Sequence, residues 1–144
     1  MFKEIRRTAL AEHNGDGIFY VDEISKMEVF HVKNDSSELC CCFMFSTPSE
    51  DDTGVAHILE HTVLCGSGMF PVKDPFSQVL LSSPNTFLNA MTFTDKTIYP
   101  FASPLKKDFD ILFDIYSDAV FNPLLRRGSF MQEGIRYSEK GFDG

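Results

Sequence analysis

The five-residue segment 57–61 places two imidazoles and a carboxylate at a spacing that could support hydrolytic chemistry: His57, Glu60 and His61. Successive residues of an α-helix are turned by about 100°, so His57 and His61 lie about 40° apart and one turn displaced. Glu60 lies about 60° to the other side of His57, within the same arc. On a helix, both imidazoles can therefore reach one metal ion with the glutamate beside it.

These side chains suit metal-assisted hydrolysis. Zn²⁺ accepts neutral imidazole readily, and with two or three protein ligands it keeps a position for water. The ion lowers the pKa of that water, and a nearby carboxylate can then take its proton. The order H-x-x-E-H occurs among zinc peptidases. From the spacing alone, two surface histidines and a glutamate that share one helix by chance remain the alternative.

The helix that carries the two histidines has sequence signals at both ends. Asp51, Asp52 and Thr53 are good N-cap residues, and the aspartates suit the positive end of the helix dipole. Gly66-Ser67-Gly68 is typical of a helix end. We therefore expect a helix that begins near residues 51–53 and ends before residue 66.

The remaining elements are predicted from hydrophobic periodicity. Residues 27–46 predict one hairpin with its turn at 34–37, and residues 86–94 with 97–101 predict a second one. Helices are expected over 76–81, over 105–120, where apolar residues form one stripe, and from Arg126 onward. The tail to Gly144 offers no obvious closing element. The predicted fold is α+β, one domain over residues 1–144 whose antiparallel sheet carries helices on one face.

Composition narrows the class of protein. Lys and Arg number 13 against 21 Asp and Glu, a net charge of −8 that argues against nucleic acid as a partner. No run of about 20 apolar residues is present to span a membrane, and no apolar signal-peptide core follows the first residues. The cytoplasm is expected, or an organelle matrix in a eukaryote.

The four cysteines agree with that compartment. Adjacent cysteines rarely meet disulfide geometry, so Cys40, Cys41, Cys42 and Cys65 are interpreted as reduced thiols. The triplet fits a strand whose side chains alternate between faces. A metal or redox role for the triplet is the alternative.

Further segments form a pattern around the histidines. The densest covers residues 52–67, and others are Phe70-Pro71, residues 73–76, 86–92 and 95–97, Tyr99-Pro100, and residues 118–123 and 132–134, with 31–35 upstream. Together they resemble the presequence-protease-type branch of the insulinase/pitrilysin family of zinc metallopeptidases. The resemblance covers about residues 27–138.

The resemblance implies roles for five residues. His57 and His61 would bind Zn²⁺, and Glu60 would be the general base that activates the zinc-bound water. Asn89 and Ala90 would hold the backbone of a peptide substrate at a strand edge, a mode that gives sequence-tolerant affinity. The zinc helix and the Asn89 strand should then lie side by side. By itself, Asn89 also reads as an ordinary turn or strand residue. The implied activity is an endopeptidase acting on short unfolded peptides, such as cleaved presequences.

The resemblance also implies parts that the 144 residues do not supply. The family's third zinc ligand, a glutamate on a later helix, is expected beyond Gly144; Glu133 and Glu139 are the alternatives within the chain. In the family, a second half contributes an Arg and a Tyr and closes a chamber around the peptide. The chain is therefore expected to be an N-terminal fragment, inactive without the remainder of the enzyme.

Two alternatives to the fragment stay open. One is a non-catalytic truncated remnant, and the other is a subunit that needs a partner chain for activity. A missing part of the sheet would leave apolar faces such as residues 87–93 uncovered, which predicts self-association.

Overall fold

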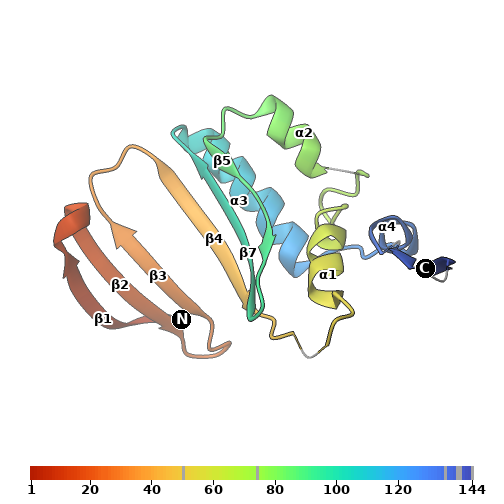
Figure 1. Cartoon of the computed structure of the whole chain (residues 1–144). Coiled ribbons are helices and arrows are strands. Elements are labelled where there is room, and N and C mark those ends of the chain that lie inside the picture. The colour runs from red at the N-terminus through yellow and green to blue at the C-terminus, as the bar shows by residue number, and fades with distance from the viewer. Residues whose placement is uncertain (50, 74, 135, 139–140, 144) are drawn as a thin grey trace. The chain divides into compact units, whose positions relative to one another are not determined.

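Two compact units make up the chain, Met1–Ser37 and Glu38–Gly144. The structure, a computed structural model, describes residues 1–49, 51–73, 75–134, 136–138 and 141–143, the last two stretches by backbone alone. Antiparallel sheets and helices alternate along the chain (Figure 1), so the predicted α+β class is confirmed. Within the described residues, no helix is long and apolar enough to cross a membrane.

The first unit is a three-stranded antiparallel sheet with the order β1-β2-β3. Its elements are β1 (Phe2–Leu10), the 3-10 turn η1 (Ala11–His13), β2 (Gly15–Asp22) and β3 (Glu28–Lys33). The Asp22 carboxylate shapes the turn between β2 and β3, because it accepts hydrogen bonds from the Ser25 backbone N–H (2.8 Å) and the Ser25 hydroxyl (2.9 Å).

The predicted hairpin over residues 27–46 is wrong. β3 pairs with β2, whereas β4 (Leu39–Ser46) pairs with β7 (Lys96–Ser103) in the second unit. The misleading signal was the polar segment 34–37, whose residue types are typical of turns. The turn between β2 and β3 is instead closed by Asp22, with Lys26 in the left-handed region at φ 62°. This turn contains no glycine that would have indicated it in the sequence.

The second unit is built on a sheet with β7 at its centre. β4 lies on one side of β7, and two short strands, β5 (Phe87–Leu88) and β6 (Met91–Thr92), pair with the other side. The second predicted hairpin is therefore confirmed, with an interruption at Asn89-Ala90. β4 alternates as expected, since Cys41 is half-buried while Cys40 and Cys42 are exposed. Burial raises the pKa of Cys41 to about 11.

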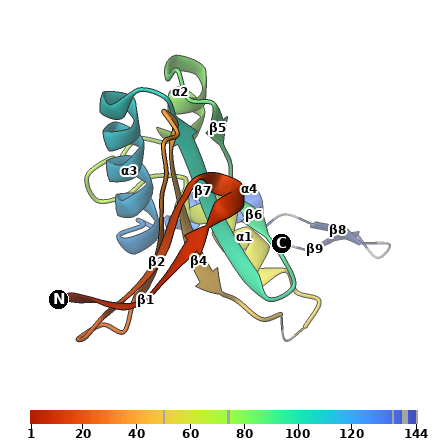
Figure 2. The ribbon, with the colours of Figure 1, turned by 90° about the vertical axis from the view of Figure 1, so that its left-hand side faces the viewer.

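Four helices accompany this sheet: α1 (Val55–Val63), α2 (Pro75–Ser82), α3 (Lys106–Phe121) and α4 (Arg127–Glu133). The predictions for α2, α3 and α4 are confirmed within one or two residues. Figure 2 shows α3 along one side of the β4–β7 pair. The hydrophobic core lies on that face and combines residues of α1, β7 and α3. Its buried members are Val63, Tyr99, Phe101, Leu112 and Tyr116.

The predicted start of α1 is wrong by two to four residues. Asp51 caps a turn ahead of the helix, where its carboxylate accepts the Thr53 N–H at 3.0 Å. The helix begins only after Gly54, whose φ of 71° is left-handed, and no side chain caps it. Its first turn is closed by Ile58 N–H donating to the Gly54 carbonyl at 3.0 Å.

The loop after α1 is tied to the end of α3. Gly66 has a φ of 118°, and a Cβ there would stand 2.6 Å from the Val72 carbonyl oxygen, so glycine is required. Leu124 N–H donates to the Gly66 carbonyl at 3.1 Å, and Met69 N–H donates to Asp118 at 2.7 Å. These bonds fix where the histidine helix ends.

The chain's last described segment is also paired. β8 (Arg136–Ser138) and β9 (Gly141–Asp143) form an antiparallel two-stranded sheet. The expectation of a tail without a closing element is therefore wrong. Polar, glycine-containing residues hid a hairpin too short to show alternation.

Candidate active site

The two histidines of α1 converge. His57 Nε2 and His61 Nε2 are 3.2 Å apart, and the ring planes meet at 75° with their centroids 4.8 Å apart. Both side chains are exposed, and His61 lines a groove. Two imidazole nitrogens on the edge of a zinc tetrahedron, each about 2.05 Å from the ion, would stand about 3.3 Å apart. The pair therefore fits a tetrahedral ion.

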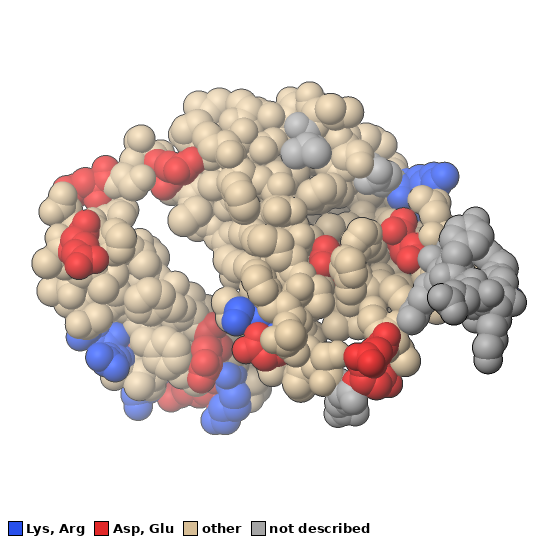
Figure 3. Space-filling model, viewed as in Figure 1, with Lys and Arg blue, Asp and Glu red and all other residues tan. Residues whose placement is uncertain are grey.

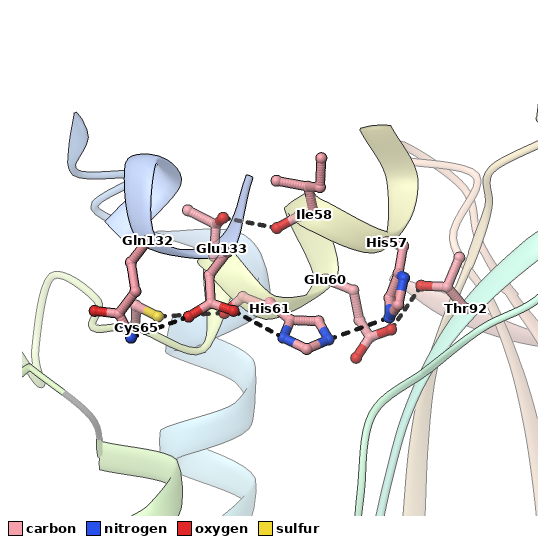
Figure 4. A network of polar contacts seen from close by, with 9 residues as sticks. His57, Ile58, Glu60, His61, Cys65, Thr92, Gln132 and Glu133 are labelled. Carbon is pink, nitrogen blue, oxygen red and sulfur yellow. Dashed lines mark hydrogen bonds and ion pairs between the residues drawn. The ribbon is translucent and has the colours of Figure 1, made fainter. Parts of the chain in front are cut away.

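Glu60 lies beside the histidines but faces the sheet. Its side chain is buried, at 6% exposure. The ligand atoms of His57, Glu60 and His61 lie within 4.8 Å of one another, and among the described residues they form the group that could hold a metal. Thr92 of β6 donates its hydroxyl hydrogen to Glu60 Oε2 at 2.7 Å (Figure 4). Burial, and secondarily the negative charge of Glu60, raises the pKa of Tyr99.

Glu133 at the end of α4 reaches the other nitrogen of His61. Its Oε2 is 3.0 Å from His61 Nδ1, and the pair is partly buried, with side-chain exposures of 22% and 47%. Figure 4 shows Glu133 on the side of the His61 ring away from His57. Because Nδ1 and Nε2 point in nearly opposite directions, a carboxylate on Nδ1 orients the ring rather than sharing an ion on Nε2. Glu139, the other candidate ligand, lies outside the described residues.

Asn89 and Ala90 occupy the gap between β5 and β6. They line a groove of about 560 Å³ together with Glu60, His61 and Glu133. The Asn89 N–H donates to the Pro100 carbonyl at 3.1 Å, and the Tyr116 hydroxyl donates to the Asn89 carbonyl at 3.2 Å. α1 packs beside β6, so the expected side-by-side placement is confirmed.

Two contacts of this site were not predicted from the sequence, that of Thr92 with Glu60 and that of Glu133 with His61. Thr92 fell inside a segment noted for its resemblance, but it received no role. Glu133 was considered as a metal ligand and not as a partner of the His61 ring. The signal for Thr92 was the pairing of residues 86–94 with 97–101, which points Thr92 and Thr97 to the same face of the sheet.

Comparison with known proteins identifies the family. The family model "Insulinase (Peptidase family M16)" matches residues 46–139. An uncharacterised protein of Borreliella burgdorferi is 53% identical over 143 residues, which are 99% of this chain and 15% of that protein. Presequence protease 1, chloroplastic/mitochondrial, of Arabidopsis thaliana is 42% identical over 138 residues, 94% of this chain and 13% of that protein.

The fold has a solved counterpart. Pitrilysin superposes with a TM-score of 0.76 at 23% identity, over 92% of this chain and 14% of that one. The chain thus spans about one seventh of the length of the proteins it matches. The family model covers the histidine helix, the groove and α4, and with it the chain belongs to the insulinase family of peptidases.

Proposed function

We propose that this chain is the zinc-binding part of a metalloendopeptidase that hydrolyses short unfolded peptides. The observation that carries the proposal is the convergence of His57 Nε2 and His61 Nε2 at 3.2 Å, with the buried carboxylate of Glu60 on the same helix face. Membership of a peptidase family supports the reaction class.

Each residue of the site has its own proposed role. His57 and His61 would hold Zn²⁺ through Nε2, and Glu133 would keep the His61 ring in place through Nδ1. When bound, the ion supplies a Lewis acid and lowers the pKa of a water molecule. Glu60 would take a proton from a water molecule beside the histidines and pass it to the leaving amine.

Asn89 and Ala90 are proposed to hold the substrate backbone. They break the strand that faces α1, so a peptide laid along this edge would pass the histidines. Several relatives are named presequence proteases of mitochondria or chloroplasts, which supports unfolded presequence-type peptides as substrates. The compartment proposed here is the cytoplasm, or an organelle matrix in a eukaryote.

The remainder of the enzyme is the proposed partner. In the described part of the chain, the group that could hold a metal consists of two imidazoles and the Glu60 carboxylate, and a further ligand, expected beyond Gly144, would complete the set. We infer that the isolated chain binds Zn²⁺ weakly and does not turn over. A subunit completed by a separate chain would share this incomplete ligand set, and it is the second candidate.

A chimera tests the reaction. The chain replaces the 143 matching residues of the Borreliella burgdorferi relative, and cleavage of an unfolded peptide is followed with and without a chelator. Chelator-sensitive cleavage is expected. Glu60→Gln should lower kcat by about a thousandfold or more, since it removes the base, while Zn²⁺ remains bound. Unchanged cleavage in Glu60→Gln would contradict the mechanism.

The metal site is tested separately by titration of the chimera with Zn²⁺. His57→Ala should weaken binding by about two orders of magnitude or more, because one of the ligands is lost. His31→Ala, an exposed histidine on β3, is the matched control and should leave affinity unchanged. Equal loss in both variants would place the ion elsewhere.

A further inference from the structure

Glu60 is held by a second element besides its own helix. The Thr92 hydroxyl, at the end of β6, donates to Glu60 Oε2 at 2.7 Å. Because Glu60 is only 6% exposed, water competes poorly for that oxygen. The bond joins α1 to the sheet at the carboxylate itself (Figure 4).

Two more threonines stand behind Thr92. Thr97 Oγ1 lies 3.5 Å from Thr92 Oγ1 and 2.8 Å from Thr47 Oγ1, and Thr97 is 3% exposed. The Thr47–Thr97 contact is a hydrogen bond in which either hydroxyl can be the donor, whereas the Thr92–Thr97 contact is longer than an ordinary hydrogen bond between hydroxyls.

From its position, Glu60 could act either as a metal ligand or as a base. Its carboxylate lies near the converging histidine nitrogens, with all three ligand atoms within 4.8 Å. Turned toward an ion, the carboxylate would become a ligand, and an oxygen that coordinates a cation is a poorer base. Held away from the ion, the carboxylate can accept a proton from a water molecule. Thr92 holds Oε2 on the side of β6, which favours the second role.

We propose that Thr92 is a positioning residue that keeps Glu60 available as the base and withholds it from the metal. Thr97 of β7 lies behind Thr92, and Thr47, directly after β4, is hydrogen-bonded to Thr97. The inference rests on the proposed function, because it presupposes that Glu60 acts on a water molecule beside an ion held by the histidines.

The test compares two substitutions at one position in the chimera, because the isolated chain is not expected to turn over. Thr92→Val keeps the shape of the side chain and removes the hydroxyl, and Thr92→Ser restores the hydroxyl. For Thr92→Val we expect kcat to fall about tenfold or more with KM within threefold, the usual cost of an outer-shell partner. Zn²⁺ affinity, measured by calorimetry, should be unchanged or tighter. Thr92→Ser should recover kcat to within threefold.

Thr94→Val is the matched control. It makes the same change at an exposed position two residues further along and should leave kcat and Zn²⁺ affinity unchanged. The positioning role is overturned by a Thr92→Val kcat within threefold of wild type, by failure of Thr92→Ser to rescue, or by a tenfold loss of Zn²⁺ affinity. If the unsubstituted chimera bound no Zn²⁺, the proposed function itself would fail and the role of Thr92 with it.

Discussion

At the scale of single residues, Glu133 is the contact with the most direct consequence for the metal. Its carboxylate meets His61 Nδ1 at 3.0 Å and so fixes which nitrogen of the ring is free. We expect Glu133→Gln to weaken Zn²⁺ binding by about ten- to a hundredfold, because a neutral amide orients the imidazole less well and lowers its basicity. Zn²⁺ titration of the chimera measures this.

Glu12→Gln removes an exposed carboxylate from the first unit and serves as the control. Affinity that stays constant in Glu133→Gln would show that the contact does not matter to the ion. Loss of binding as complete as in His57→Ala would instead make Glu133 a ligand.

The residues of α1 show how far spacing alone can lead. A period of 3.6 residues brings His57, Glu60 and His61 to one face, so their proximity was predictable. The partners of these side chains come from β6 and α4, and those lie 32 and 72 residues away in the sequence. No local pattern specifies contacts over such separations, since tertiary packing decides them.

At the scale of elements, the end of α3 clamps the loop that follows the histidine helix. The Ser67 hydroxyl, with the backbone N–H of Met69 and the Asn122 side chain, favours the charged form of Asp118 and lowers the pKa of its carboxyl. A lowered pKa in the folded state means that the charge stabilises the fold above the ordinary aspartate pKa. That contribution is lost as the pH falls through the folded-state value.

We therefore expect Asp118→Asn to lower the free energy of unfolding by about 1 kcal/mol at pH 7, as for a partly exposed hydrogen bond to a charge. The difference from wild type should begin to shrink below about pH 4, where the aspartate of the unfolded chain takes up its proton, and should vanish below the lowered folded-state pKa. Thermal unfolding of the chain between pH 3 and pH 7 measures it. Asp114→Asn, one turn earlier on α3 and exposed, is the control. A difference that stays constant down to pH 3 would refute the clamp.

The elements that were predicted share one property. α3 and the strands around Asp95-Lys96 each have a buried face, so apolar residues recur in their sequences with the period of a helix or a strand. β1 carries four charged residues among its nine, and nearly all of the nine are exposed. No alternation of apolar and polar residues therefore marks it as a strand. Its pairing with β2 depends on backbone hydrogen bonds, which the side chains do not reveal.

At the scale of the whole molecule, the two units differ in how much they bury. The sequence predicted one domain, and the structure describes two compact units. In the first unit, Gly17 and Ile18 are the buried residues. The second contains the aromatic core around Phe101 and Tyr116.

The sheet of the second unit leaves apolar groups open to solvent. Among the described strands, β4 has a neighbour only on the side of β7, and Met44 on its outer face is 63% exposed. Phe87 and Phe93, at the ends of the segment predicted to be uncovered, are 48% and 47% exposed. Figure 3 shows few charged side chains over β5, β7 and α2. A strand edge without a paired strand, beside apolar side chains, favours pairing with another chain.

We expect the isolated chain to self-associate, with a sedimentation-average mass that rises with concentration. Met44→Lys should weaken the association constant about tenfold or more, because a charged side chain on an edge strand opposes strand addition. Ile24→Lys adds the same charge at an exposed position of the first unit and should leave association unchanged. Circular dichroism of both variants checks that the fold is kept. A chain that stays monomeric at every concentration, or an equal effect of the two lysines, would refute association through β4.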